Sequence, residues 1–175
     1  MPRKPAASPA PSAYGRALNR LARRDHAEAE MRQALRRAGH AEAEVEEAVA
    51  RLKGLRAIDD ERFAESFARS RMAYRGLGRN RVRAALRQRG VARAAAERGL
   101  KGALRDLSET DALDALARRY WTQRAADEPR RRMAKLWVFL LRRGFPADLV
   151  RDRLATLWPR HREALDGLEE AEDES

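Results

Sequence analysis

With 175 residues, the chain is long enough for one ordinary domain or for a few small modules, so length alone does not choose between them. Alanine, leucine, arginine and glutamate dominate while valine, isoleucine and threonine together number only ten, which excludes a β-rich fold. The net charge of +11 favours a polyanionic partner, the absence of cysteine excludes disulfides and thiolate metal sites, and no apolar run approaches the roughly 20 residues that span a bilayer.

The chain begins with a segment rich in proline, alanine and serine, MPRKPAASPAPS (1–12). This segment lacks the apolar core of a signal peptide, so we expect a disordered leader without a targeting role. The absence of cysteine fits a reducing compartment. The sequence therefore predicts a cytoplasmic protein with no membrane segment.

Three residues that cap helices well mark the beginning of three helical segments. Ser12, Asp59 and Ser108 precede helices that we expect at about 12–24, 60–74 and 109–122. Their side-chain oxygens can accept the unpaired amides of a first helical turn. Acids that follow a cap, such as those in the run IDDER, also suit the positive pole of the helix dipole.

Three apolar stretches that end in basic residues and a glycine recur along the chain. They are MRQALRRAGH (31–40), VRAALRQRGV (82–91) and LWVFLLRRGF (136–145). When they are aligned on Gly39, Gly90 and Gly144, an apolar residue lies eight positions before each glycine and a leucine four before it. Apolar matches continue ten and thirteen positions after the glycine. The glycines lie 51 and 54 residues apart, which indicates a repeated unit of about 50 residues.

Each of these glycines follows a basic helical end, where a left-handed backbone costs glycine little and cations face the negative pole of the helix. We therefore interpret them as helix stops, each followed at once by another helix. The result is an all-α fold of nine helices, in three tandem three-helix repeats that form an elongated modular array. The predicted organisation is a leader (1–12), a first repeat (13–58), a basic second repeat (59–107), a third repeat (108–160) and an acidic tail (161–175).

The positive charge is concentrated in the second repeat. Between Arg62 and Arg105 there are 13 arginines and lysines against two acids, and the difference equals the whole net charge of +11. The rest of the chain is neutral overall, and Glu163 to Ser175 carries seven acids and no base. A segregated basic block is the electrostatic signature of a polyanion partner, although a solvated arginine-rich surface would give the same composition.

Within this block, Arg79, Arg83 and Arg87 recur every four residues beside an expected buried stripe of Val82, Ala85 and Leu86. Like charges at this spacing repel by about 0.2–0.5 kcal/mol per pair, and no carboxylate nearby in the sequence offsets them. We interpret them as a ladder of cations for an external anion, aimed by a turn at Gly76 and Gly78. The alternative is that the arginine stems only cover apolar surface. The candidate binding residues are Arg69, Arg71, Arg75, Arg79, Arg81, Arg83, Arg87 and Arg89.

Other features predict packing rather than chemistry. Phe63, Phe67 and Tyr74 share a helical face and are expected in the core, as are the tryptophans at 121, 137 and 158. The three histidines are scattered and have no ligand spacing, so no metal or cofactor is expected. No nucleophile has a base near it in the sequence, and we expect that the protein is not an enzyme.

The run IDDERFAESFARSRMAYRGLGRNRVRAALRQRGV (58–91), together with LARRDHAEAEMRQALRRAGH (21–40), resembles the RecX family of regulators of the RecA recombinase. The resemblance implies an array of three-helix bundles that binds in the groove of a RecA filament on DNA. It also implies restraint of the ATPase, strand-exchange and coprotease activities of RecA, in homologous recombination and the SOS response. The expected partners are the RecA filament and, through charge, single- and double-stranded DNA, with the protein as a monomer.

Two other functions stay open at this point. The protein could be a general DNA-binding module in which Arg79 to Gly90 enters a major groove, although few residues there can read bases. It could also be a helical interaction scaffold whose charge is incidental.

Overall fold

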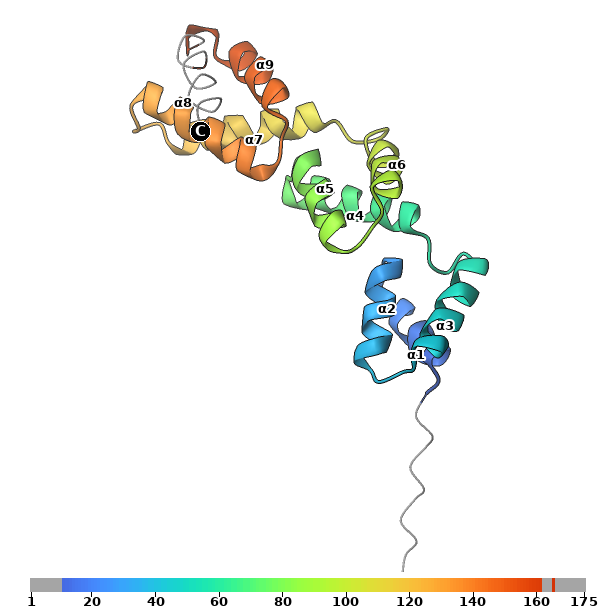
Figure 1. The fold of residues 1–175 in the computed structure, drawn as a ribbon. Helices are drawn as coiled ribbons and strands as arrows, with labels where there is room; N and C mark the ends of the chain where they lie inside the picture. The colour runs from blue at the N-terminus through green and yellow to red at the C-terminus, as the bar shows by residue number, and fades with distance from the viewer. Residues whose placement is uncertain (1–10, 162–164, 166–175) are drawn as a thin grey trace, which may run out of the picture.

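The chain is built from helices in every part that the structure describes. A computed structural model describes residues 11–161 and residue 165 (Figure 1). Over these residues there are nine α-helices, one short 3-10 helix and no strand, which confirms the predicted all-α class. The helices are α1 Ala13–Leu21, α2 Glu28–Arg37, α3 Glu42–Gly54, α4 Asp60–Arg75, α5 Arg79–Gln88, α6 Arg93–Ala103, α7 Glu109–Gln123, α8 Pro129–Arg143 and α9 Ala147–Leu157, followed by η1 Pro159–His161.

The three predicted caps all begin helices. Ser12 Oγ accepts the N–H of Gly15 at 3.1 Å, and Ser108 Oγ accepts the N–H of Asp111 at 3.0 Å. Asp59 Oδ1 accepts two first-turn amides, both at 3.0 Å. Each cap satisfies donors that have no partner inside the helix and contributes about 1 kcal/mol.

Successive helices form three three-helix bundles, arranged one after another in an elongated array (Figure 1). We call α1–α3 the first unit, α4–α6 the second and α7–α9 the third. Each unit has its own apolar core, and each of the positions matched by aligning the glycines lies in one. The predicted leader and acidic tail lie mainly outside the described residues.

The aligned glycines end helices as predicted. Gly39, Gly90 and Gly144 have φ of +86°, +77° and +89°, values that glycine adopts without the steric cost of a Cβ atom. The amide that follows each glycine then bonds to the carbonyl of the leucine four positions before it: His40 to Leu35 at 3.3 Å, Val91 to Leu86 at 3.1 Å and Phe145 to Leu140 at 3.3 Å.

The joint between the first and second units consists of one hydrogen bond from the backbone to a side chain and a close approach of Gly90 to α2. Asp60 Oδ1, on the first residue of α4, accepts the N–H of Glu28, the first residue of α2, at 2.8 Å. Gly90 lies so near Ala29 that a Cβ on the glycine would meet the Ala29 Cβ at 2.4 Å. Ala27, although it belongs to the first unit, is buried in the core of the second.

The joint between the second and third units repeats this geometry. Glu109 Oε1, on the first residue of α7, accepts the N–H of Arg79, the first residue of α5, at 2.7 Å. Here the close contact is made by two glycines, and a Cβ on Gly78 would meet the Gly144 backbone at 2.4 Å. The amides of Gly78 and Asn80 also bond to the carbonyls of the third unit, each at 2.9 Å.

The same joint cannot be extended at either end of the described array. It needs an acid at the first residue of one unit's first helix and a free N–H at the first residue of the preceding unit's second helix. Ala13, which begins α1, has no carboxylate, and Pro129, which begins α8, has no N–H. Neither Ala13 nor Pro129 can therefore make this hydrogen bond.

The prediction that Tyr74 lies in the core is wrong. Tyr74 is 88% exposed, whereas α4 buries Phe63, Ala64, Ala68 and Met72. The packed face of α4 is centred on its small residues because Gly99 of α6 lies directly over Ala64, where a Cβ would come within 2.5 Å of the Ala64 Cβ. Of the three aromatic residues, Phe63 is buried in the core, Phe67 packs partly against it, and Tyr74 lies outside it. The three tryptophans do pack with the third core, Trp137 fully buried and the other two partly.

We predict that Gly78→Ala destabilises the protein by about 1–3 kcal/mol, the usual cost of overpacking, because the new methyl group would displace the Gly144 backbone. The φ of Gly78 is −77°, so alanine adds no backbone strain there. Chemical denaturation measures the change. The matched control is Gly54→Ala, which meets nothing within 4 Å and should stabilise by about 0.4–1 kcal/mol. Equal stabilities for the two variants would contradict the joint described here.

Candidate functional site

A groove crosses the boundary between the first and second units, and we call it the basic groove. Its volume is about 830 Å³. One wall comes from α2, and the rest comes from α4, α5, the turn between them and the two residues that follow α5. Five arginines contribute to its lining: Arg36, Arg71, Arg75, Arg81 and Arg89.

The turn between α4 and α5 brings these cations together. Gly76 ends α4 in the left-handed conformation, with φ of +57°, and the Leu77 N–H bonds to the Arg71 carbonyl at 3.3 Å. Gly78 then begins α5 as its N-cap. Because the link is this short, Arg81 near the beginning of α5 lines the same groove as Arg75 at the end of α4. The predicted turn at the two glycines is confirmed.

Phe67 is the aromatic residue of the groove. The guanidinium carbons of Arg71 and Arg89 each lie 4.9 Å from its ring centroid, within cation–π range. These contacts hold two cations near the groove without neutralising them. Arg89 also forms an ion pair with Glu30 of α2.

The groove keeps most of its positive charge. Across residues 11–161, no carboxylate lies within ion-pair distance of Arg71, Arg75 or Arg81. Glu30 is the acid in the lining, and it is shared between Arg89 and Arg24. Burial acts to raise the pKa of Glu30, but the two arginines lower it further, so that it lies below its usual range. Glu30 is therefore a fixed carboxylate at neutral pH, and it offsets only part of the groove's charge.

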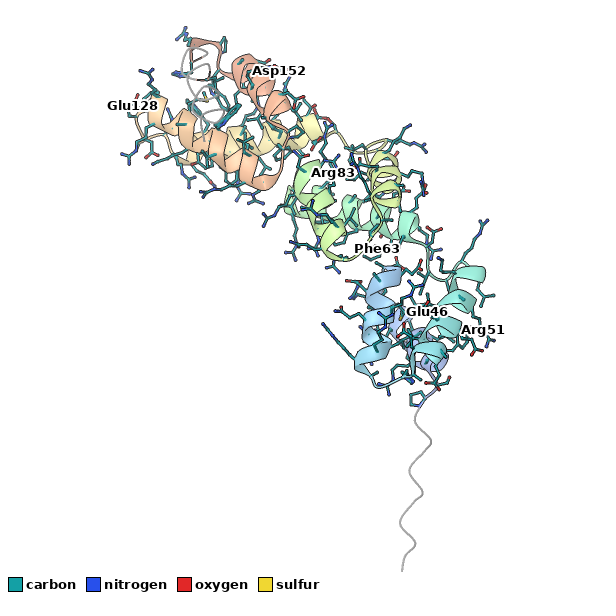
Figure 2. All side chains as sticks on the ribbon, in the orientation of Figure 1. Glu46, Arg51, Phe63, Arg83, Glu128 and Asp152 are labelled. Atoms are coloured by element: carbon teal, nitrogen blue, oxygen red, sulfur yellow. The ribbon has the colours of Figure 1, made fainter. Side chains whose placement is uncertain are left out.

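The ladder predicted along α5 is not free. No acid within α5 offsets it, as expected, but acids from other helices do. Arg79 Nε donates to Glu109 Oε2 at 2.5 Å, and Arg83 Nε donates to Glu97 Oε1 at 2.5 Å. Figure 2 shows Arg83 between α5 and α6. Of the three ladder arginines, only Arg87 has no ion pair within the part of the chain that the structure describes.

The eight predicted arginines thus fall into two sets. Arg71, Arg75, Arg81 and Arg89 line the basic groove, whereas Arg69, Arg79, Arg83 and Arg87 lie outside it. Arg69 is held by Glu65 and by Asp106, the latter at 2.5 Å. Sequence reasoning missed Arg36, which comes from the first unit and is paired with Glu42. The repeat gave no signal for it, because the counterpart of Arg36 in the second unit is Arg87, which lies outside the groove.

The described residues hold no group of three or more histidine, cysteine, aspartate or glutamate side chains that could bind a metal ion. None of the helices between residues 11 and 161 is both long enough and apolar enough to cross a membrane.

Three family models match successive parts of the chain. They are described as the first, second and third three-helix domains of RecX, and they match residues 13–52, 59–100 and 108–154 respectively. The three matches correspond to the three units of the fold.

Curated relatives and solved structures agree with these models. A protein named "Regulatory protein RecX" from Chromohalobacter salexigens is 37% identical over 144 residues, which cover 81% of this chain and 90% of the relative. One of the same name from Halorhodospira halophila is 39% identical over 142 residues, covering 77% and 81%. The crystal structure of RecX from Lactobacillus salivarius superposes with a TM-score of 0.74 at 25% identity, covering 83% of this chain and 94% of that one.

We predict that Arg79→Ala lowers the free energy of unfolding by about 1–3 kcal/mol, because it leaves Glu109, whose side chain is only 4% exposed, without its charged partner. The matched control is Arg87→Ala on the same helix, which removes an exposed arginine and should change stability by less than about 0.5 kcal/mol. Urea denaturation of both variants tests this. If the two variants lost the same stability, the Glu109 pair would not be structural.

Proposed function

Because the chain belongs to the RecX family, we propose that it regulates the RecA recombinase by binding in the groove of the RecA–DNA filament. In this proposal it restrains the ATPase, strand-exchange and coprotease activities of RecA in homologous recombination and the SOS response. It acts as a cytoplasmic monomer and catalyses no reaction itself. The basic groove is the observation that supports the proposal most directly.

The groove has the chemistry that a nucleoprotein filament requires. Arg71, Arg75 and Arg81 offer cations that no carboxylate within the described residues neutralises, so a polyanion can pair with them without breaking an existing ion pair. Phosphates that bind there release condensed counterions, which makes the affinity depend on salt. Arginine also pairs with phosphate oxygens through two parallel donors.

The elongated shape supports binding along a filament rather than at one point. The three units follow one another in a row (Figure 1), and the groove lies at the joint of the first two. The third unit is held to the second by the Glu109 contact and by Arg143, whose Nη1 donates to the Arg75 carbonyl at 2.8 Å. We infer that the middle of the array contacts the anionic part of the filament and that the outer units add protein contacts.

A sequence-reading role for α5 fits the structure less well. A recognition helix contacts base edges with residues at its N-terminus. The N-terminus of α5 is covered by the third unit, because the amides of Gly78 and Asn80 bond to the Arg143 and Gly144 carbonyls at 2.9 Å. Entry into a major groove would require that this joint open, so electrostatic binding without sequence readout is favoured.

We predict that the protein suppresses the ATPase of RecA on single-stranded DNA at amounts well below those that would coat the DNA. The double variant Arg75→Glu/Arg81→Glu should need roughly tenfold more protein or more, equivalent to about 1.4 kcal/mol of binding free energy. Its affinity for the filament should also depend less on salt, with a slope of log affinity against log salt smaller by about 1.4 for two phosphates of a single strand.

The matched control is Arg118→Glu/Arg119→Glu, which reverses two exposed charges of α7 outside the groove. It should inhibit RecA as the wild type does. Inhibition only at coating ratios would instead favour the rival function, simple competition for DNA. Equal loss in both double variants would mean that net charge, not the groove, drives binding.

A further inference from the structure

A second cationic cavity lies in the first unit, outside the residues used in the proposed function. Its volume is about 390 Å³, and it is formed by α1 and the link from α1 to α2. We call it the arginine pocket. Its lining residues are Arg16, Asn19, Arg20, Arg23, Arg24 and His26.

Few carboxylates neutralise the arginines of the pocket. From Ser12 to Arg24 the sequence holds four arginines and no acid. Among the described residues, Arg24 alone of these four arginines has a carboxylate partner. Its Nη1 lies 3.3 Å from Glu30 Oε2. Arg16 and Arg20 are four residues apart on α1, where like charges repel one another. Sequence analysis overlooked this stretch because the charges outside the second repeat sum to zero.

Several donors in the pocket are buried and unused. The Nε atoms of Arg16 and Arg20 are inaccessible to solvent and have no hydrogen-bond partner. The His26 side chain is only 4% exposed, and its Nδ1 also has no hydrogen-bond partner, the nearest Glu30 oxygen being 3.6 Å away. Buried polar groups in folded proteins are nearly always hydrogen-bonded, so the pocket has donors to offer to an acceptor from outside the described residues.

The chemistry of the lining identifies that acceptor. Guanidinium groups are donors only, and their planar forks match the oxygens of a phosphate group. His26 lies in the same positive field: burial, then Arg24 and Arg20, lower its pKa below the usual range. Glu30, which opposes these effects, is already engaged by Arg24 and Arg89.

The arginine pocket adjoins the basic groove. Glu30 lines the groove and bonds both to Arg24 of the pocket and to Arg89 of the groove, so one carboxylate side chain connects the two cavities. A strand that leaves the groove on the α2 side therefore meets the pocket next. This continuity distinguishes a nucleic-acid backbone from a free phosphate ion as the source of the ligand.

We propose that the arginine pocket binds a backbone phosphate of the nucleic acid whose neighbouring phosphates occupy the basic groove. The inference rests on the proposed function, since it extends the same polyanion contact from the second unit into the first. Arg16 and Arg20 donate to the phosphate oxygens, and His26 lies beside them as a third donor when it is protonated.

The test follows the His26 ring by NMR in the full chain, with and without a single-stranded oligothymidylate and, separately, with inorganic phosphate. A bound anion favours the imidazolium form, so the oligonucleotide should raise the pKa of His26. The double variant Arg16→Gln/Arg20→Gln should abolish this response and reduce the salt slope of DNA binding by about 0.7, the value for one phosphate of a single strand. The matched control Arg118→Gln/Arg119→Gln should leave both unchanged.

Three results would overturn the inference: DNA binds while the His26 signals stay as they were, the response persists without Arg16 and Arg20, or inorganic phosphate alone produces it. The wild-type titration needs no variant, so a folding defect in the double variant cannot hide the answer. If Arg75→Glu/Arg81→Glu loses DNA binding while Arg16→Gln/Arg20→Gln binds normally, the proposed function stands and this inference fails.

Discussion

One hydrogen bond determines how successive units of the array are arranged. It joins an acid at the first residue of one unit to the free amide at the start of a helix in the unit before it. The first amides of a helix have no partner within that helix, so an acceptor supplied from outside both satisfies them and fixes the position of its donor. Asp60 does this for α2 and Glu109 for α5. Because α2 is anchored in this way, it forms a wall of the basic groove opposite α4 and α5.

The two joints are not equally favourable for their acids. Glu109 has a charged partner in Arg79 as well as the amide, and its burial is thereby compensated. Among the described residues, Asp60 has the Glu28 amide as its single hydrogen-bond donor, and burial, the largest effect, raises its pKa. A raised pKa in the folded protein means that the carboxylate form is disfavoured there, so the stability that this group contributes is lost as the pH rises through that pKa. At neutral pH the ionised Asp60 therefore stabilises its joint less than the protonated form would.

Local sequence signals predicted most of the fold, and tertiary contacts account for what they missed. The caps at Ser12, Asp59 and Ser108 and the glycine stops were predictable because each depends on residues within one helical turn. The site was predicted only in part. Glu97 and Glu109 lie 14 and 30 residues from the arginines that they neutralise, so no analysis of spacing along α5 could find them. Arg36 and the arginine pocket belong to the first unit, where opposite charges elsewhere concealed a local excess.

Our central claim is that the groove between the first two units is the surface that meets the RecA filament. The chain has no cysteine, so a single introduced cysteine can carry a photo-crosslinker at a known place. Gln88→Cys puts it in the lining of the groove, and Ala115→Cys puts it on an exposed position of α7 outside the groove. On RecA assembled on single-stranded DNA, we expect crosslinks to the DNA of the filament from position 88, removed by an excess of unlabelled protein, and few to the DNA from position 115. Equal crosslinking to the DNA from both positions, or none from position 88, would contradict the claim.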